Sequence, residues 1–258
     1  MTYKKRARRT GSSSGIGRAT ALAFAKAGID VALVSRSQEK LAAVAAAATN
    51  FGVTVKAYPV DLADLPRVKD NISAIVADFG VIDILVNNAG MGYTGTVTDT
   101  PLSHWQQVLD LNLTSPFLCI QGVLPEMRSQ KFGLIVNVAS ISAAANFPGW
   151  AAYNVSKAGL VSLSKTLAAE ESAHGIRVTS LCPGAVSTPL WDTATVQADF
   201  PREAMMSPES IADTILHITL LSATAAIPEL SILPTGVNLK LPAEFSSWSK
   251  YHLYHSLQ

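Results

Sequence analysis

Short runs of aliphatic and β-branched residues recur along the chain and alternate with longer stretches that have a helical period. Each short run predicts a buried strand, and the five runs lie at 31–34, 53–58, 82–86, 134–138 and 177–181. The longer stretches predict helices at 18–27, 38–48, 65–79, 103–128, 151–174 and 208–221. Strands that alternate with helices are typical of a parallel sheet covered on both faces. The pattern therefore predicts an α/β fold with a parallel sheet between two helical layers.

One domain accounts for this pattern, because no internal repeat and no linker rich in proline, glycine or serine interrupts it. We place the domain at 10–242, between an atypical basic segment at 1–9 and a C-terminal tail at 243–258. The chain has 258 residues, of which 48% are apolar and 15% charged, so it can bury a large core.

Charge, cysteine and histidine content argue against several classes of protein. The net charge of +1 creates no field that would attract nucleic acid or an anionic membrane, so neither partner is expected. The apolar runs are too short to span a bilayer, and no apolar segment follows the N-terminal charges as it does in a secretory signal. The two cysteines, Cys119 and Cys182, lie in apolar stretches, which is typical of buried thiols in a reducing compartment. We expect a cytoplasmic protein without a metal site, since the histidines lack a ligand pattern.

A glycine-rich segment, Thr10-Gly-Ser-Ser-Ser-Gly-Ile-Gly17, precedes the first predicted helix and the strand at 31–34. Glycines allow a tight turn and let the backbone approach a pyrophosphate, while the helix N-terminus supplies N–H groups and a positive dipole end. A glycine triplet alone more often marks a turn than a nucleotide site, but the order of loop, helix and strand reverses that preference. The candidate phosphate-binding residues are Gly11, Ser13, Ser14, Gly15, Ile16 and Gly17.

The residues before this loop are unusual for such a fold. A buried apolar strand is expected directly before Thr10, but the chain has Lys4-Lys-Arg-Ala-Arg-Arg9 there. Unpaired charges are costly to bury, so these residues are not expected to form a central strand. Three interpretations are open: a basic targeting or nucleic-acid patch, an exposed tail with the first strand missing, and an N-terminal sequence that is not native, for example after a frame error in the gene. We favour the third, under which Val-Ala-Leu-Val at 6–9 would improve folding and cofactor affinity.

The end of the second predicted strand indicates which nucleotide binds. An acidic side chain at this point accepts a hydrogen bond from a ribose 2′-hydroxyl, whereas arginine accommodates a 2′-phosphate. Here the strand is followed by Arg36, and no acidic residue occurs before Glu39. The sequence favours NADP(H) over NAD(H), the alternative being that Arg36 is a solvated loop residue. Asp61, after the strand at 53–58, either receives the adenine amino group or caps the next helix.

A tyrosine and a lysine, Tyr153 and Lys157, stand one helical turn apart. The lysine charge favours the phenolate and is expected to lower the tyrosine pKa from its usual value of about 10. A more acidic tyrosine can exchange a proton with a substrate oxygen near neutral pH. Ser140 can hold that oxygen, because it follows the strand at 134–138 at the carboxyl end where such sheets bind ligands, and Ser142 is a second hydroxyl in reach. Tyr-x-x-x-Lys alone is weak evidence, since many helices contain it by chance.

In combination, these motifs resemble the short-chain dehydrogenase/reductase family from Thr10 to about residue 240. The matching pieces follow the family order and spacing, and they are TGSSSGIG, Asp61, Asn87-Asn-Ala-Gly90, Asn112, Ser140, Tyr153-x-x-x-Lys157 and Pro183-Gly184. The resemblance implies a Rossmann fold, a single doubly wound three-layer α/β/α domain that binds NAD(P)(H). It also implies hydride transfer to or from a carbonyl or alcohol carbon.

The resemblance implies roles for individual residues. Tyr153 would be the general acid in reduction and the base in oxidation, while Lys157 would bind the nicotinamide ribose and lower the tyrosine pKa. Ser140 would orient and polarise the substrate oxygen. Asn112 would hold a water that links Lys157 to solvent, and an asparagine inside the predicted helix at 103–128 can also distort that helix. Further cofactor contacts would come from Asn88, Ala89, Gly90, Pro183, Gly184, Val186 and Thr188, in addition to Tyr153 and Lys157.

The segment at 185–207 is expected to select the substrate. Its apolar side chains suggest a mobile lid that favours an apolar carbonyl compound over a sugar. These side chains are Leu190, Trp191, Phe200, Met205 and Met206. The run at 228–236 is similar to the tails of NADP-dependent reductases of hydroxy-acid or general carbonyl type, and it lacks the TGxxxxxDGG pattern of members that reduce fatty-acyl thioesters. Because family members usually assemble through two long helices, a homodimer or homotetramer is expected.

The leading hypothesis is an NADP(H)-dependent oxidoreductase that acts on a small carbonyl or secondary alcohol compound. A 3-oxoacyl-[acyl-carrier-protein] reductase is the alternative within the family. A non-catalytic nucleotide-binding regulatory protein is the alternative from another class. The complete Asn-Ser-Tyr-Lys set disfavours this last alternative, because drift without catalysis would break the set first.

Overall fold

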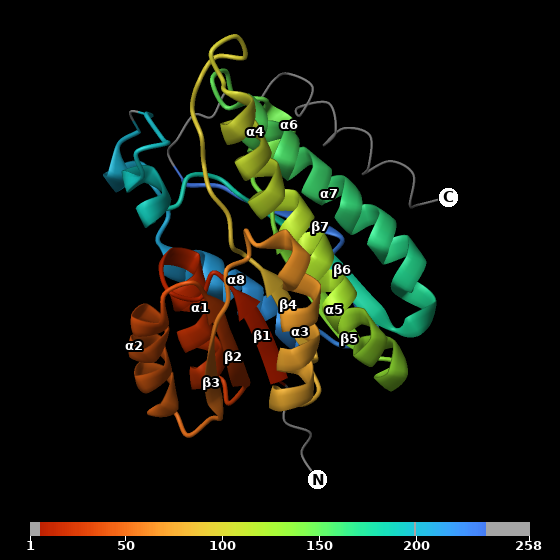
Figure 1. Cartoon of the computed structure of the whole chain (residues 1–258). Coiled ribbons are helices and arrows are strands. Elements are labelled where there is room, and N and C mark those ends of the chain that lie inside the picture. Colours follow the sequence, from red (N-terminus) through yellow and green to blue (C-terminus); the bar gives the residue numbers. More distant parts are fainter. Residues whose placement is uncertain (1–5, 199, 236–258) are drawn as a thin grey trace.

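A computed structural model describes residues 6–198 and 200–235 of the chain. Its centre is a seven-stranded sheet in the order β3-β2-β1-β4-β5-β6-β7, in which every neighbouring pair is parallel (Figure 1). The strands are β1 Arg6–Thr10, β2 Asp30–Ser35, β3 Val55–Pro59, β4 Ile84–Asn87, β5 Gly133–Val138, β6 Ile176–Pro183 and β7 Glu229–Ile232. The chain winds outward from β1 to β3, and then from β4 to β7 on the other side. This confirms the predicted doubly wound α/β architecture.

Helices cover both faces of the sheet (Figure 1). One layer consists of α1 (Gly15–Lys26), α2 (Gln38–Thr49) and α8 (Pro208–Leu220), whose side chains share one core cluster. The other consists mainly of α3 (Leu65–Phe79), α5 (Ser115–Gln130) and α7 (Ala151–Glu171), which share a second cluster. The smaller elements are α4 Leu102–Leu109, η1 Asp110–Thr114, α6 Ser142–Ala145, η2 Ser172–His174, η3 Pro189–Asp192 and η4 Arg202–Ala204. The three-layer prediction is therefore confirmed.

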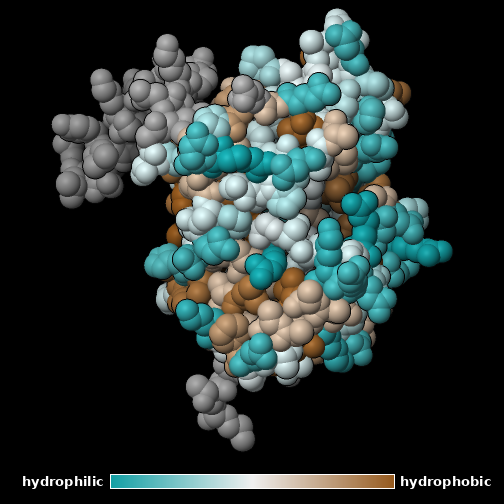
Figure 2. Space-filling model, turned by 90° about the vertical axis from the view of Figure 1, so that its left-hand side faces the viewer, coloured by the Kyte–Doolittle hydropathy of each residue, from teal (hydrophilic) through white to brown (hydrophobic). Residues whose placement is uncertain are grey.

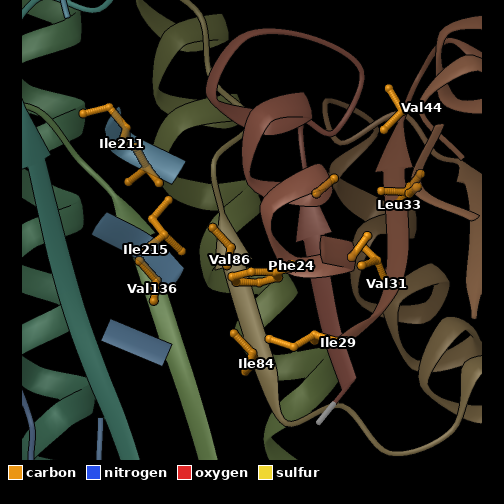
Figure 3. Close-up of a cluster of buried hydrophobic side chains, with 14 of the residues drawn as sticks. Phe24, Ile29, Val31, Leu33, Val44, Ile84, Val86, Val136, Ile211 and Ile215 are labelled. Carbon is orange, nitrogen blue, oxygen red and sulfur yellow. The ribbon is translucent and has the colours of Figure 1, made fainter. Parts of the chain in front are cut away.

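The first core cluster shows how the sequence pattern becomes packing. Phe24 of α1 is fully buried and lies between side chains of β2 and β4, including Val31 and Val86 (Figure 3). Ile211 and Ile215 of α8 are also fully buried and extend the cluster toward β5 (Figure 3). Burying side chains of this size contributes about 1.5–3 kcal/mol each before the cost of chain entropy. The short apolar strands and the helical apolar stripes therefore meet in one continuous core.

The side of the molecule that carries α2 has a mixed surface (Figure 2). Tan and brown residues gather in the lower half of this view, and teal residues lie mainly above and beside them. Three alanines of α2, Ala42, Ala43 and Ala46, are exposed and contribute apolar surface. Alanine is the best helix former, so these positions favour the helix without packing against a core.

The first strand is a correction to the sequence analysis. The basic segment was not expected to form a central strand, yet Arg6–Thr10 is β1 and pairs with both β2 and β4. Its register places Ala7 opposite Val31 on one side and Ile84 on the other. Pairing of this kind uses backbone N–H and C=O groups, which every non-proline residue supplies, and without β1 the inner edges of two buried strands would lack partners. The sheet thus begins at Arg6 rather than at Thr10, and the interpretation of an exposed tail with no first strand is wrong.

Two further predictions need adjustment. The helix predicted at 103–128 is divided into α4, the π-helical turn η1 and α5. By length and composition this run, Leu102–Gln130, could cross a membrane, but core helices of soluble proteins meet the same test, and 44% of its apolar window is buried. The edge strand β7 was not predicted at all. The aromatic tail and the domain end at 242 lie outside the described residues.

Candidate active site

A cavity of about 770 Å³ opens at the carboxyl ends of the strands, where β1 and β4 diverge in winding direction. Open α/β sheets bind their ligands at this position, and cavities of about 300–1,000 Å³ suit small molecules and cofactors. Most of the predicted site residues line it. They are Gly11, Ser13, Ser14, Gly15, Ile16, Arg36, Asp61, Asn88, Ala89, Gly90, Ser140, Tyr153, Lys157, Pro183, Gly184, Val186 and Thr188. The other two, Gly17 and Asn112, lie behind this lining.

The glycine loop forms one end of the cavity. Gly11 and Gly15 have φ angles of 65° and 49°, a left-handed conformation that glycine adopts without strain. A Cβ atom at Gly17 would lie 1.6 Å from the carbonyl oxygen of Gly11, so only glycine fits where α1 packs against the loop. The Asn88 side chain donates a hydrogen bond to the same carbonyl at 3.4 Å. The loop therefore has the tight turn and close helix packing that a pyrophosphate-binding loop requires.

Two cations line the neighbouring part of the cavity, after β2. Arg36 and Lys40 are both exposed and both reach the lining. Ser37 begins α2, and its Oγ accepts a hydrogen bond from the backbone N–H of Lys40 at 3.3 Å. Sequence reasoning found Arg36 but missed Ser37 and Lys40. The i, i+4 spacing of the two cations around a serine N-cap was the available signal.

Of the two interpretations offered for Asp61, the helix cap is wrong and the contact with adenine stays a prediction. Asp61 lines the cavity, but its Oδ1 accepts a hydrogen bond from the backbone N–H of Ala63 at 2.9 Å, which forms a local turn. The residue at the start of α3 is Asp64, so Asp61 does not cap that helix. A position facing the cavity from a fixed turn suits a contact with a ligand.

The predicted catalytic residues meet at the other end of the cavity. Tyr153 and Lys157 lie one turn apart on α7, with the lysine Nζ 5.6 Å from the tyrosine ring centroid. Lys157 is buried, and its ammonium donates a hydrogen bond to the Val138 carbonyl at 2.8 Å. Ser140, two residues after β5, forms a side-chain hydrogen bond with Tyr153. The hydroxyls of Ser140 and Tyr153 are thus held together beside a buried cation.

Burial shifts the protonation of both groups. Burial raises the pKa of Tyr153 to about 12, and the hydrogen bond from Ser140 opposes this only in part. Burial lowers the pKa of Lys157 to about 8. The tyrosine shift is opposite to the lowering expected from the lysine charge, so that expectation is wrong. The tyrosine pKa rises because burial removes water from the phenolate and so penalises the charged form strongly. The lysine charge does not offset this, since burial also penalises the ammonium, and the ammonium donates its hydrogen bond to the Val138 carbonyl.

Asn112 occupies the π-helical turn between α4 and α5 and is fully buried. Its Oδ1 accepts from the backbone N–H of Met91 at 2.8 Å, and its Nδ2 donates to the Met91 carbonyl at 2.9 Å and to Ser156 Oγ at 3.1 Å. The expected local distortion of the helix is therefore confirmed. These bonds connect the strand β4 exit loop to α7, next to Lys157. The water that Asn112 was expected to hold stays a prediction.

A buried chain of polar side chains joins the strand ends to α7. Asn87 donates to Asn137 at 2.9 Å, Asn137 donates to Ser164 at 2.8 Å, and Ser164 donates to the Leu160 carbonyl at 2.6 Å. Because buried polar groups are costly when unpaired, this series of hydrogen bonds specifies how β4, β5 and α7 align. It fixes the helix that carries Tyr153 relative to the loop that carries Ser140. Sequence reasoning missed this chain, since its members are far apart in sequence.

Aromatic and apolar side chains line the cavity beyond Ser140 and Tyr153. They are Ile141, Phe147, Pro148, Trp150, Leu190, Trp191, Ala198 and Phe200. Sequence reasoning identified Leu190, Trp191 and Phe200 but missed Phe147 and Trp150, although Trp150 lies only one turn before Tyr153. Ser142 also lines this part, and its buried hydroxyl has no hydrogen-bond partner among the described residues. Met205 and Met206 are not part of the lining, and Met206 instead pairs with Val186.

Both cysteines, Cys119 and Cys182, are buried, and neither forms a disulfide within the described residues. Within the part of the chain that the structure describes, no group of three or more histidine, cysteine or acidic side chains could hold a metal ion.

Comparison with known proteins identifies the same family as the motifs. The family model for short chain dehydrogenases matches residues 5–199. A 3-oxoacyl-[acyl-carrier-protein] reductase, FabG of Staphylococcus aureus, is 36% identical over 80% of this chain and 83% of its own length. The uncharacterized oxidoreductase YxjF of Bacillus subtilis is 32% identical over 88% of this chain and 95% of its own length.

A solved structure has the same fold. The alcohol dehydrogenase from the archaeon Thermococcus sibiricus, complexed with 5-hydroxy-NADP, superimposes with a TM-score of 0.81. The two chains are 26% identical, and the match covers 89% of this chain and 96% of the other.

Proposed function

Because this chain belongs to the short-chain dehydrogenase family of oxidoreductases, we propose that it reduces a small ketone or aldehyde with NADPH, and that it catalyses the reverse oxidation of the corresponding alcohol. The observation that carries this proposal is the hydrogen bond between Ser140 and Tyr153 beside the buried Lys157, on the wall of a dinucleotide-sized cavity. Bound NADPH would supply the hydride. The protein's own residues supply the proton and position the substrate oxygen.

Tyr153 is suited to donate a proton. With its pKa raised to about 12, the phenol stays protonated at neutral pH, and charge develops on the carbonyl oxygen only as the reaction proceeds. Ser140 donates a second hydrogen bond to that oxygen and so stabilises its developing charge. Lys157 brings a positive charge close to the phenolate and stabilises it as it forms, since its Nζ lies 5.6 Å from the tyrosine ring centroid.

The preference for NADP(H) over NAD(H) rests on Arg36 and Lys40. Both cations line the cavity next to the N-terminus of α2, where a 2′-phosphate of the adenosine ribose would lie. The described cavity lining has no acidic residue directly after β2, where an acidic side chain would receive the 2′-hydroxyl of NAD(H). The NADP derivative bound to the Thermococcus sibiricus enzyme is consistent with this preference.

Assembly and location are also proposals. We expect a cytoplasmic homodimer or homotetramer that forms through α5 and α7, which present Phe117 and Val155 at the surface with exposed fractions of 42% and 47%. Native mass spectrometry of the wild-type protein and of the double variant Phe117→Asp, Val155→Asp tests this. We expect the wild type to be oligomeric and the variant to dissociate, whereas a wild-type monomer would contradict the proposal.

A 3-oxoacyl-[acyl-carrier-protein] reductase is a second candidate, favoured by the 36% identity to FabG. The regulatory alternative is disfavoured, because Ser140, Tyr153 and Lys157 line the same cavity, with Ser140 hydrogen-bonded to Tyr153 and the Lys157 Nζ 5.6 Å from the tyrosine ring centroid. NADPH oxidation separates the three possibilities when it is followed with a 3-oxoacyl thioester, with a panel of ketones and with a panel of aldehydes.

The decisive experiment compares wild type with Tyr153→Phe in that assay, with NADPH and NADH in parallel. We expect wild type to turn over ketones, and Tyr153→Phe to lose about 10²–10⁴-fold in kcat while it still binds NADPH. Binding of NADPH is measured separately by its fluorescence. If both proteins bind NADPH and neither reduces any compound, the enzyme hypothesis is wrong and the regulatory one is favoured.

A further inference from the structure

Four aromatic rings form one continuous wall around the substrate half of the cavity. The Trp150 ring meets the Tyr153 ring edge-on at 5.4 Å between centroids, and it meets Trp191 edge-on at 6.0 Å. Trp191 in turn stacks on Phe200, again at 6.0 Å. All four residues line the cavity and are partly buried, so each ring retains surface toward the space beside Ser140. The wall therefore begins at the proton donor itself.

Polar contacts hold the Trp191 side of this wall in place. The indole Nε1 of Trp191 donates to the Val186 carbonyl at 2.9 Å, which satisfies the only polar atom of the ring. Arg202 forms an ion pair with Asp192 and donates to the Thr188 carbonyl at 3.0 Å. The two ends of the segment 188–202 are thus joined, and Trp191 presents an apolar ring to the cavity.

The same segment is attached to the loop that follows β4. The backbone N–H of Thr94 donates to the Thr195 carbonyl at 2.9 Å, and Thr195 Oγ1 donates to the Gly92 carbonyl at 2.8 Å. Thr94 Oγ1 accepts from the backbone N–H of Gln197 at 2.7 Å. These bonds join the loop after β4 to the segment that carries Trp191 and Phe200, so they help to fix where that segment lies.

Apart from Lys157, the charged side chains of the described lining lie in the cofactor half of the cavity. Among the described lining residues, the charged side chains are Arg36, Lys40, Asp61 and Lys157. The first three lie at the adenosine end, and Lys157 is directed to the Val138 carbonyl. A carboxylate or phosphate on the substrate would therefore be buried without a cationic partner, which is costly.

We propose that the substrate is a neutral ketone with an aromatic ring attached to the carbonyl carbon, or the corresponding secondary alcohol. This inference rests on the proposed function. With its oxygen held by Ser140 and Tyr153, such a ketone places its ring against Trp150 and Trp191, where offset-stacked and edge-on contacts favour an aromatic ring over a saturated ring of similar size. The reaction is a two-electron reduction in which NADPH and one proton convert the C=O bond to CH–OH and leave NADP⁺.

Steady-state turnover of three matched compounds tests the preference. Acetophenone carries the ring, cyclohexyl methyl ketone has a saturated ring of similar size, and phenylglyoxylate adds a carboxylate. We expect kcat/KM for acetophenone to exceed both others by at least tenfold. Equal or faster turnover of the cyclohexyl or carboxylate compound would overturn the proposal.

Two variants connect the preference to the wall. In Trp191→Leu and in Phe200→Leu, we expect the acetophenone to cyclohexyl ratio of kcat/KM to fall at least fivefold. The matched control is Phe51→Leu, which removes a phenylalanine that is 48% exposed and outside the cavity lining, and its ratio should equal that of wild type. An unchanged ratio in both cavity variants would contradict the role of the aromatic wall.

A binding measurement separates this proposal from the enzymatic one. Ketones cannot be reduced in the presence of NADP⁺, so calorimetry of the wild-type protein with NADP⁺ reports ketone affinity alone. We expect acetophenone to bind at least fivefold more tightly than cyclohexyl methyl ketone. Tighter binding without any turnover would support the aromatic site and refute the enzymatic function. Turnover of ketones with no aromatic preference would support the enzymatic function and refute the aromatic site. If the protein shows neither turnover nor tighter binding of acetophenone, both proposals are refuted.

Discussion

The two ends of the cavity bind by different physical means. At the adenosine end, exposed cations and a tight backbone loop are the available ligands, as Arg36, Lys40 and Gly17 show. At the carbonyl end, the groups are buried or partly buried, and burial shifts the pKa values of Tyr153 and Lys157 in opposite directions. Exposed charges interact weakly in water, whereas buried polar groups depend strongly on single partners. Substitutions at the carbonyl end should therefore have larger effects than substitutions at the adenosine end.

After Tyr153→Phe, the largest effect is expected from Ser140→Ala. Loss of its hydroxyl removes the group that is hydrogen-bonded to Tyr153 and that would donate to the substrate oxygen when substrate is bound, and comparable losses cost about 100- to 1,000-fold in kcat. Ser142→Ala is the matched control, because Ser142 lines the same cavity but its buried hydroxyl has no hydrogen-bond partner among the described residues. Ser142→Ala should lose less than about tenfold. Equal losses in the two variants, measured by ketone-dependent NADPH oxidation, would mean that the two hydroxyls share the role.

The backbone loop at the adenosine end gives the next largest effect. In Gly17→Ala, the added Cβ would meet the Gly11 carbonyl oxygen at 1.6 Å, so the loop must shift. Forced repacking of this kind typically costs about 1–3 kcal/mol, which corresponds to about 5- to 150-fold in the NADPH dissociation constant if the strain falls on the loop.

Gly52→Ala is the control for Gly17→Ala. Gly52 has a φ of 75° and open space around its Cβ position, far from the cavity lining. Substitution there should lower the melting temperature while the affinity for NADPH, measured by fluorescence titration, stays at the wild-type value. An unchanged affinity in Gly17→Ala as well would show that the loop does not bind the cofactor.

The two ends of the cavity also differ in how well the sequence predicts them. The glycine loop and Arg36 could be predicted, because backbone turns and exposed charges depend on nearby sequence. Phe147 and Trp150 were not predicted, because local sequence does not show which side chains of the segment before α7 line the cavity. The direction of the Tyr153 pKa shift was predicted wrongly, since the lysine is visible in the sequence and the burial of the phenol is not.

The fold shows a parallel division. The five strands that sequence predicted consist mainly of apolar runs, and the two that it did not predict are exceptional. β7 lies at the edge of the sheet, and its residues Glu229–Ile232 are exposed or half-buried, so no apolar run marks it. β1 forms by backbone pairing between β2 and β4 although its sequence is basic. Backbone pairing and sheet position are properties of the whole topology, which local composition does not report.

The pH dependence at the carbonyl end should follow Lys157, whose pKa is lowered to about 8 by burial. If its charge stabilises the forming phenolate, kcat/KM for reduction should fall by about tenfold between pH 7 and pH 9, because the amine loses most of its charge over that range. A profile that is flat across this range would exclude such a role for the charge.

The same group makes an opposite contribution to stability. Unfolding returns the pKa of Lys157 toward 10.5, so between about pH 8 and 10.5 the unfolded chain binds more protons than the folded protein. This contribution to the unfolding free energy therefore rises with pH across that window. Tyr153 acts in the reverse sense, since its pKa is raised to about 12, and its contribution falls between about pH 10 and 12. The unfolding free energy, measured by denaturant titration at each pH, should rise more steeply with pH between pH 8 and 10 in wild type than in Lys157→Met.

A smaller effect is expected for the exposed cations. Arg36→Ala and Lys40→Ala should each raise the dissociation constant of NADPH about fivefold and leave that of NADH unchanged, because each contact is exposed and worth about 1 kcal/mol. Added salt should weaken NADPH binding to wild type more than to either variant. If NADH binding falls in parallel with NADPH binding, the two cations do not recognise the 2′-phosphate.

A change in free energy of similar size is expected from the strand that leads into the glycine loop. β1 lies between β2 and β4, and all residues of these two strands are buried. The triple variant Arg6→Val, Arg8→Leu, Arg9→Val gives this position the apolar sequence that its neighbours have. We expect it to be stabilised by at least about 1 kcal/mol, which corresponds to a rise in melting temperature of about 2–4 °C for a domain of this size.

Because β1 runs directly into the loop at Gly11, a firmer strand should also tighten NADPH binding, while the carbonyl end keeps its kcat. Arg67→Val is the control, since that arginine is exposed on α3 and its loss should change stability by less than about 0.5 kcal/mol. A triple variant with the wild-type melting temperature and NADPH affinity would show that the sheet tolerates the basic strand. A gain in melting temperature and in NADPH affinity would mean that the basic strand, rather than the exposed charges, limits the affinity of the adenosine end.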